Sequence, residues 1–541
     1  MASPDENDAQ SSGIELATAG RRPSHYDAEK ASPNIALRLA SLSPAQNYND
    51  NDDENALERS QTRWYKSIKF FHHNLETRGM QRVPPQARHD SKGTTWLNIS
   101  MMWFGINCAA NNVTLGMLGP TVFTLSFTDS AICGVLGGIV GSIPVAYVAI
   151  FGPRSGNRTM VFSRYIMGWY PSKLIVVLTL IGLLGYCIID GVVAGQILSA
   201  VSANGSLSII VGIVIVAIIT WFVTTFGYGA FQIYERYAWL PQLIVCCILA
   251  GVAGPKFDLT GNPSANLPWL TLAGNRLSFF SINFSAAITY TDLAADYFVY
   301  MAEDTPRRNI VLGTLAGLWA SFTFMFILGN GLASGIATNP AWSDAYEVSQ
   351  GALIVEALKP LGPFGSFCSV VIAIGLVANI VAPTYSAGLD FQALGRYIEP
   401  VPRVILNTVC VVIWTVCAIA GRANLAEIFT NFLALMGYWV SIWLAIVVEE
   451  HLIFRKYKKL GWDWEAWNDR SKMPFGIAAI VAFLIGWAGA ILCMAQVWYI
   501  GPLSKAAFGA GGGDMGNYVG FAWTAFAYPP LRWLELTRFK R

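Results

Sequence analysis

The sequence predicts an all-α polytopic membrane protein with twelve membrane-spanning helices. Of its 541 residues, 54% are hydrophobic and only 13% are charged, whereas soluble proteins carry about 25% charged residues. From residue 93 onward, apolar runs of about 20 residues, the length that crosses a bilayer, follow one another along the chain. As a third observation, a short sequence motif recurs in the first and sixth runs, which indicates that the helices are arranged as a repeat.

Residues 1–92 differ in composition from the rest of the chain. They are polar, acidic and poor in aromatic residues before Trp64, which predicts a disordered cytosolic tail. They lack the apolar core of a secretory signal peptide. From Arg63 the tail becomes basic and aromatic, which fits either an interfacial helix on the cytoplasmic leaflet or a solvated linker.

The apolar runs fill residues 93–530, which are predicted to form one domain. The twelve expected spans are 95–118, 126–151, 172–200, 206–226, 236–254, 277–300, 309–334, 362–390, 402–420, 424–447, 474–497 and 515–530. If the N-terminus is cytosolic, the loops on that side hold most of the basic residues, including Arg154, Arg158 and the cluster RKYKK at 455–459. The opposite loops hold few, so the positive-inside rule places both ends in the cytosol, with 531–541 a short C-terminal tail.

The recurring motif predicts an inverted repeat. WFGINCAA at 103–110 resembles FFSINFSA at 279–286, in the first and sixth spans. Five spans separate the copies, so they run in opposite directions, and the repeats would cover roughly 95–254 and 277–447. Broken helices at matching positions of such repeats offer free backbone groups to a ligand at mid-membrane, with Asn107 or Asn112 nearby. The alternative is that Asn107 and Asn283 only join neighbouring helices by hydrogen bonds.

The third span contains one charge, Asp190, in an apolar run from about residue 174 to 200. A carboxylate there costs roughly 2.5–3.5 kcal/mol on insertion scales, which favours a functional role. Asp190 could contact a bound molecule, carry a proton, or pair with a neighbouring helix. The small residues Gly185, Gly191 and Gly195 predict that this span packs closely against the broken first and sixth helices.

The eighth span is also irregular. In GLVANIVAPTYSAGLDFQALG at 375–395, the polar residues from Asn379 to Ser386 and the imide of Pro383 are expected to interrupt the helix. Such a break is tolerated in a membrane only beside protein or a water-filled space.

Several function classes are disfavoured. The nine Cys show no zinc or disulfide spacing, and the five His lie outside the apolar runs, so neither a metal site nor an intramembrane histidine relay is expected. The spans hold no catalytic cluster, so neither an enzyme nor a cofactor is expected. A sensor would need a structured cytosolic domain, and the net charge of +2 gives no sign of nucleic-acid binding.

Long motifs along the chain resemble a known family. They are FGPRSGNRTMVFSRYIMGWYPSKL (151–174), GYGAFQIYERYAWLP (227–241), AADYFVYMAEDTPR (294–307), VANIVAPTYSAGLDFQALG (377–395) and YPPLRWLEL (528–536). In this order they are similar to fungal purine–cytosine permeases of nucleobase–cation symport family 1. The resemblance implies a twelve-helix LeuT-like fold, a plasma-membrane location and proton-driven uptake of cytosine and purines.

The resemblance also implies site residues. Family members place an aromatic four residues before an Asn in the third span, and the matching pair here is Tyr186 and Asp190. A Trp-Thr-Ser stretch in the sixth span corresponds to Tyr290, Thr291 and Asp292.

The eighth span keeps Asn379 but has Ile380, Ala382 and Pro383 where the family has further Asn and Pro residues. Glu235 matches an acidic position of the fifth span. Asp190, Glu235 and Asp292 carry carboxyl groups in the third, fifth and sixth spans, and they are the candidates for proton coupling.

These departures leave the substrate open. An amide can donate and accept along the edge of a nucleobase, whereas an ionised carboxylate only accepts. Asp190 and Asp292 would therefore suit a donor-rich or cationic ligand. A vitamin B6 permease, or a permease for another nitrogen heterocycle, is the alternative to a nucleobase transporter.

Overall fold

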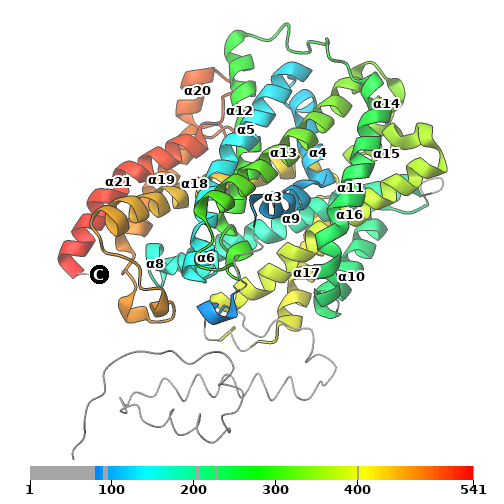
Figure 1. The fold of residues 1–541 in the computed structure, drawn as a ribbon. Helices are drawn as coiled ribbons and strands as arrows, with labels where there is room; N and C mark the ends of the chain where they lie inside the picture. The colour runs from blue at the N-terminus through cyan, green and yellow to red at the C-terminus, as the bar shows by residue number, and fades with distance from the viewer. Residues whose placement is uncertain are drawn as a thin grey trace, which may run out of the picture. The chain divides into compact units, whose positions relative to one another are not determined.

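A computed structural model describes residues 80–88, 95–202, 206–226, 228–395, 397–398 and 401–539, except for the side chains of 228–238 (Figure 1). The chain divides into residues 1–60 and 61–541, and every described residue belongs to the second unit. The described regular structure is helical, apart from one isolated bridge between Ala495 and Ile500. Most of the predicted tail, including its basic aromatic part up to residue 79, lies outside the described residues.

Each predicted span overlaps one helix or a pair of helices. In chain order they are α3 (Trp96–Asn107), α4 (Ala110–Thr121), α5 (Phe127–Ala149), α9 (Pro171–Val201), α10 (Ile209–Phe226), α11 (Tyr228–Ala253), α12 (Trp269–Ile288), α13 (Arg307–Ser334), α16 (Pro363–Ala393), α17 (Arg403–Gly421), α18 (Leu425–Glu449), α19 (Ile477–Cys493) and α21 (Gly516–Phe539). Within the described residues, eight helical segments are long and apolar enough to cross a membrane on their own.

Shorter helices fill the connections. They are η2 (Pro85–Ala87), α6 (Phe151–Ser155), α7 (Thr159–Phe162), α8 (Arg164–Met167), η5 (Gly254–Lys256), η6 (Thr289–Asp292), η7 (Asp296–Phe298), η8 (Gly335–Ala337), α14 (Pro340–Val348), α15 (Gln350–Leu358), η9 (Lys359–Leu361), η10 (Glu450–Tyr457), η11 (Trp464–Ala466), η12 (Arg470–Lys472) and α20 (Pro502–Phe508). The π-helical η10 continues α18, so one helical segment runs from Leu425 to Tyr457.

Two of the expected helix breaks are present. The first span is split because Cys108 and Ala109 leave the helical conformation, with Ala109 extended at φ −135° and ψ 152°. The sixth span leaves the α-helix after Ile288 and continues as the 3₁₀ turns η6 and η7. Backbone N–H and C=O groups are thus released from both helices inside the bundle.

The break expected in the eighth span is absent. The helix α16 runs without interruption from Pro363 to Ala393, with Pro383 inside it. A single proline removes one backbone hydrogen bond and bends a helix without having to end it. The prediction of an interrupted span at 379–386 was therefore wrong.

The helices pack as a bundle around the split first span. α13 packs against α3, α4 and α5, α9 packs against α16, and α12 packs against α5. A Cβ on Gly329 of α13 would lie 2.0 Å from the Val113 carbonyl oxygen of α4, so this contact requires glycine. At one edge of the bundle, α19 and α21 lie side by side, away from α10 and α11 (Figure 1).

The small residues of α9 face other helices than predicted. A Cβ on Gly185 would meet the ring of Phe432 on α18, and one on Gly191 would meet Trp414 of α17. Gly195 approaches the backbone of α10. The expectation that these glycines pack on the broken helices was wrong, because the spacing of small residues does not tell which neighbour they face.

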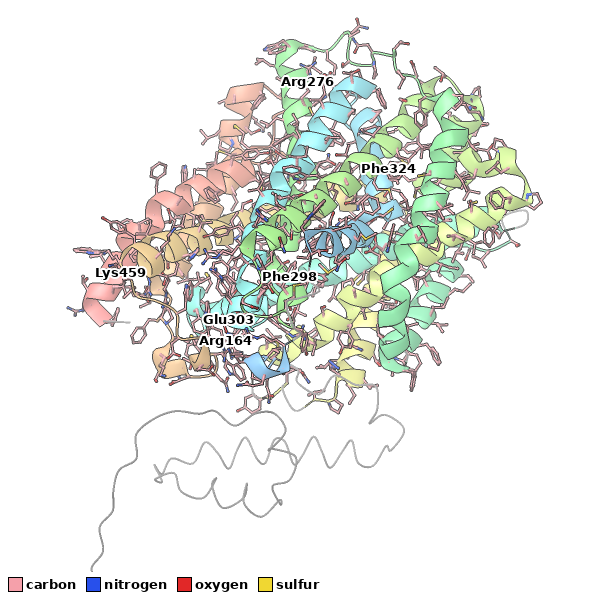
Figure 2. All side chains as sticks on the ribbon, viewed as in Figure 1. Arg164, Arg276, Phe298, Glu303, Phe324 and Lys459 are labelled. Atoms are coloured by element: carbon pink, nitrogen blue, oxygen red, sulfur yellow. The ribbon has the colours of Figure 1, made fainter. Side chains whose placement is uncertain are left out.

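Charged side chains mark the two ends of the bundle. Arg164 and Glu303 lie near one end and Arg276 near the other (Figure 2). At the Arg164 end, Val83 donates its N–H to the Gly156 carbonyl at 2.9 Å, so part of the predicted tail, residues 80–88, is held against the turn after α6. The last helix, α21, continues beyond residue 530, and its buried Arg532 pairs with Glu450 at 3.1 Å.

Candidate functional site

Asp190 lies where α9 meets α16 and α4. Its side chain is fully buried, and its Oδ2 accepts a hydrogen bond from Nδ2 of Asn379 at 2.7 Å. The side chain of Asn111 on α4 also interacts with this carboxyl group. Its other oxygen, Oδ1, has no hydrogen-bond partner among the described residues. The two predicted residues Asp190 and Asn379 are thus brought together from distant parts of the sequence.

Tyr186 stands one turn before Asp190 on the same helix. Its hydroxyl group shares a hydrogen bond with Oγ1 of Thr289, the first residue of η6. Its ring lies nearly parallel to that of Tyr290, with centroids 6.4 Å apart and planes at 28°. This separation is near the upper end of the range for aromatic pairs. The predicted aromatic pair is therefore adjacent, with Phe432 edge-on to Tyr186.

The turn η6 carries the rest of the predicted sixth-span set. Tyr290 makes an edge contact with Trp103 of α3 at 5.8 Å between centroids. Thr291 is fully buried, and its hydroxyl group has no partner in the described part of the chain. Asp292 is also buried at the end of this turn. The broken sixth helix thus places an aromatic ring, a hydroxyl group and a carboxyl group next to one another.

The two asparagines of the recurring motif make the same local bond. Nδ2 of Asn107 donates to the Trp103 carbonyl oxygen at 3.1 Å, and Nδ2 of Asn283 donates to that of Phe279 at 2.7 Å. Each amide bonds four residues back in its own helix, so the alternative that they mainly join different helices is not what the structure shows. Oδ1 of both residues has no partner within the described ranges.

Asn112 acts at the break of the first span. Its Nδ2 donates to the carbonyl oxygen of Asn107 at 2.8 Å, so it satisfies one backbone group released there. Neither Asn107 nor Asn112 makes a side-chain hydrogen bond to Asp190 or Tyr186 among those observed. Asn111, which is not among the predicted site residues, is the asparagine of this segment that interacts with Asp190.

A second group of charged residues lies outside the predicted set of site residues, and one of its members, Asp390, was missed from the sequence. Asp296 of η7 accepts hydrogen bonds at 2.7 Å from both the N–H and the hydroxyl group of Thr159, and Arg158 lies 3.5 Å from its other oxygen. Asp390 of α16 is buried nearby, with one oxygen unpartnered among the described residues. Its signal was visible: it stands in the eighth apolar run as Asp190 stands in the third.

The remaining predictions concern histidine and an acidic residue of the fifth span. His451, one of the five His expected outside the apolar runs, lies in the helical continuation of α18, where its Nδ1 shares a hydrogen bond with the Tyr147 hydroxyl group at 2.5 Å. Glu235 belongs to α11, but its side chain lies outside the described residues. No cluster of His, Cys, Asp or Glu able to hold a metal occurs within the described ranges.

Comparison with known proteins shows relatives along most of the chain. A family model for permeases for cytosine/purines, uracil, thiamine and allantoin matches residues 82–519. The vitamin B6 transporter TPN1 of Saccharomyces cerevisiae is 32% identical over 86% of this chain and 88% of its own. The purine-cytosine permease fcyB of Emericella nidulans is 35% identical over 86% of this chain and 90% of its own.

Solved structures show the same fold. Mhp1, a nucleobase-cation-symport-1 family transporter in a closed conformation with bromovinylhydantoin bound, superposes with a TM-score of 0.64 at 13% identity, over 86% of this chain and 96% of its own. A Na⁺-coupled sialic acid symporter superposes with a TM-score of 0.59 at 12% identity, over 89% and 97% of the two chains. The chain therefore belongs to the family of permeases for cytosine/purines, uracil, thiamine and allantoin, and it is a multi-pass membrane transporter.

Proposed function

We propose that this protein is a secondary active transporter for a nucleobase-like nitrogen heterocycle, cytosine or a purine in the first place, with uptake driven by protons across the plasma membrane. The observation that carries the proposal is the meeting of Asp190 and Asn379 beside the parallel rings of Tyr186 and Tyr290. Aromatic faces bind flat heterocycles by stacking, at about 1–3 kcal/mol per base in nucleic-acid binders. Polar groups beside them can read the edge of the ring.

The fold part of the proposal is a twelve-span arrangement with two inverted five-helix repeats, two further helices, and both termini in the cytosol. The matching bonds of Asn107 and Asn283 support the repeat, because the same motif makes the same contact in the first and sixth spans. The basic residues at 455–459 and Arg164 support the orientation. Fluorescent or epitope tags fused to the two ends should both report from the cytosolic side, and tags that report from opposite sides would contradict an even number of spans.

The geometry at Asp190 limits the chemical class of ligand that the site can bind. Asn379 uses one of its two Nδ2 hydrogens in the bond to Asp190, so two acceptors, Oδ1 of Asp190 and the side-chain oxygen of Asn379, and one remaining N–H donor are left at this pair. An edge on which acceptors outnumber donors favours a heterocycle with N–H donors, such as the exocyclic amino group of cytosine or adenine. It disfavours a ligand whose facing edge offers only acceptors, since like groups would then oppose each other without a proton between them.

A second substrate, pyridoxine, is favoured by the same edge. A pyridine nitrogen that carries a proton is a cationic donor, and it would pair directly with an ionised Asp190. The similarity to the vitamin B6 transporter supports including pyridoxine in the first assays. Asp190, Asp292 and Glu235 are the proposed proton carriers, since each is a carboxyl group of the third, sixth or fifth span.

Uptake assays test the function. Radiolabelled cytosine, adenine, hypoxanthine and pyridoxine are offered to yeast lacking its own transporters, with and without this chain. We expect saturable uptake of at least one of them, inhibited by a proton uncoupler. Absence of saturable uptake for all four, with the protein present at the cell surface, would contradict the proposed substrate class. Uptake that a sodium gradient drives and an uncoupler leaves unchanged would contradict proton coupling.

A further inference from the structure

Three serines form a polar stripe on α12 that faces the start of α21. Ser278, Ser281 and Ser285 are spaced three and four residues apart and therefore share one face of the helix. Each bonds to residues 514–517, where α21 begins. We call the three serines together with Asp514 and Asn517 the polar seam.

Every serine of the polar seam has a partner across it. Ser278 Oγ accepts from the Asp514 N–H at 3.0 Å, and Ser281 Oγ donates to the Asp514 carbonyl oxygen at 2.8 Å. Ser285 Oγ accepts from Nδ2 of Asn517 at 3.0 Å. Ser281, Ser285, Asp514 and Asn517 are all buried. These bonds join the broken sixth helix to the last helix of the chain.

The α21 side of the polar seam is itself held in place. The Asp514 carboxylate accepts hydrogen bonds from the Tyr438 hydroxyl group, from Nε2 of Gln496 at 3.0 Å, and from the Gly516 N–H at 2.9 Å. Ser441 of α18 donates to Oδ1 of Asn517 at 3.1 Å. A network whose members are all paired in a low-dielectric interior is stiff. Asn517 is therefore a fixed point for α12.

The helices approach closely at Ser285. A Cβ on Gly437 of α18 would lie 2.1 Å from Ser285 Oγ, so a larger residue there would push the serine from its place. Hydrogen bonds are directional and have fixed partners, whereas apolar contacts are not directional, so the serine bonds define one position of α12 along α21. The polar choice therefore fixes the register of α12.

Ser285 is one helical turn before Thr289, which bonds the Tyr186 hydroxyl group and precedes Tyr290. We infer that Asn517 is a positioning residue for the transport site: through Ser285 it fixes the last turn of α12 and so sets where Thr289 and Tyr290 stand relative to Tyr186. This inference rests on the proposed function for its transport readout. Asn517 acts through Ser285 and touches none of the site residues named above in the observed hydrogen bonds.

Transport kinetics test the inference with Asn517→Leu, which keeps the volume and removes the amide. We expect its KM to rise about three- to tenfold, the range that one net hydrogen bond gives, for every transported heterocycle alike. Vmax per surface molecule and the order of substrate preference should stay unchanged. Ser285→Ala should also raise KM, and the double variant should be no worse than Asn517→Leu alone, because Asn517→Leu already removes the bond to Ser285 along with the bond from Ser441.

Thr524→Val is the matched control. Thr524 is a buried hydroxyl residue of the same helix, but it donates to the Gly520 carbonyl oxygen within α21. Removal of the Thr524 hydroxyl group should leave KM unchanged. If Asn517→Leu and Thr524→Val change KM equally, or if the effects of Asn517→Leu and Ser285→Ala simply add, the positioning role is wrong.

A measurement that needs no substrate keeps the two proposals separate. Hydrogen–deuterium exchange of the segment 286–292 should be faster in Asn517→Leu and in Ser285→Ala than in the wild type, and unchanged in Thr524→Val. If the wild type transports none of the heterocycles, the proposed function fails while this exchange experiment still decides the inference. Equal exchange in all four proteins would overturn it.

Discussion

Two buried polar regions of this transporter differ in how completely their groups are paired. In the candidate site, which we call the Asp190 region, the atoms Asp190 Oδ1 on α9, Thr291 Oγ1 on η6 and Asn107 Oδ1 on α3 have no hydrogen-bond partner among the described residues. In the polar seam, every buried side-chain oxygen and nitrogen has one. Buried polar groups are normally paired, because an unpaired one costs about 1–3 kcal/mol.

This difference in pairing indicates that one region binds a ligand and the other holds helices in place. Unpaired groups at a helix break are what a site for a polar ligand requires, since the ligand can then supply the missing partners. A saturated network has nothing left to offer a ligand and instead fixes its helices. The Asp190 region and the polar seam meet at α12, so one region can bind while the other sets its geometry.

The largest expected effect comes from removing the carboxyl group of the Asp190 region. Asp190→Ala should abolish saturable uptake, because Asn379 Nδ2 and the ligand donor would both lose their acceptor. Asp190→Asn should keep uptake but shift preference toward neutral nucleobases, since an amide restores a donor. Competition for uptake by neutral and cationic heterocycles at pH 4.5 and 7 measures the shift.

Asp344→Ala is the control, since Asp344 is exposed on α14. It should transport like the wild type. If Asp190→Asn and Asp190→Ala both keep wild-type affinity and selectivity, Asp190 serves only to join α9 and α16.

The aromatic part of the site should give the next largest effect. Tyr186→Ala should weaken uptake about ten- to hundredfold, as expected for the loss of one stacking ring. Tyr186→Phe keeps the ring and removes only the bond to Thr289, so its loss should be smaller. Transport at low substrate concentration, normalised to surface protein, measures both. Equal losses in the two variants would show that the hydroxyl group matters and the ring does not.

The stability of the protein should depend more on the polar seam than on the Asp190 region. Asp514→Leu should lower the free energy of unfolding by roughly 1–3 kcal/mol or more, because Tyr438, Gln496 and the Gly516 N–H are left without an acceptor. Asp190→Leu should cost less, because one oxygen of Asp190 has no partner to lose. Thermal unfolding in detergent compares them, and a larger loss for Asp190→Leu would contradict the distinction between the two regions.

A smaller effect concerns pH and the polar seam. Burial raises the pKa of Asp514 from 3.8 to about 6, although hydrogen bonds from Tyr438, Gly516 and Gln496 oppose the rise. Because the folded state holds this proton more tightly than the unfolded chain, the stabilisation is full below about pH 4 and is lost as the pH rises through about 6. Asp514→Asn removes this dependence.

The unfolding temperatures of the wild type and Asp514→Asn, measured between pH 4 and 7, should therefore diverge in the variant's favour as the pH rises, apart from a constant offset. A difference that stays constant across this range would show that Asp514 does not titrate there.

Hydropathy alone located the helices, because length and apolar composition are local properties. A lone charge identified Asp190, and the same signal was present at Asp390 but was not used. The pairing of Asp190 with Asn379 depends on the contact between α9 and α16, which no local pattern contains.

The sequence did not predict which neighbouring helix each face of a helix contacts. Gly185 and Gly191 were expected against the broken helices and instead receive Phe432 and Trp414. Ser285 could equally have donated a hydrogen bond to the backbone of its own helix, as Ser142 does to the Gly138 carbonyl oxygen at 2.6 Å. The bond between Ser285 and Asn517 therefore could not be predicted from the sequence. Side-chain type predicts a hydrogen bond, whereas its partner depends on packing.

The most direct test is whether substrate binding needs the unpaired acceptor at Asp190. Purified wild-type protein is heated with and without the heterocycle that the uptake assay identifies, at about 100 times its Kd. The wild type should gain about 2.7 kcal/mol of stability, seen as a higher unfolding temperature. Asp190→Ala should show no such gain, and Asp344→Ala should show the full gain. An equal gain in Asp190→Ala would contradict the account, because the substrate would then bind without this carboxyl group.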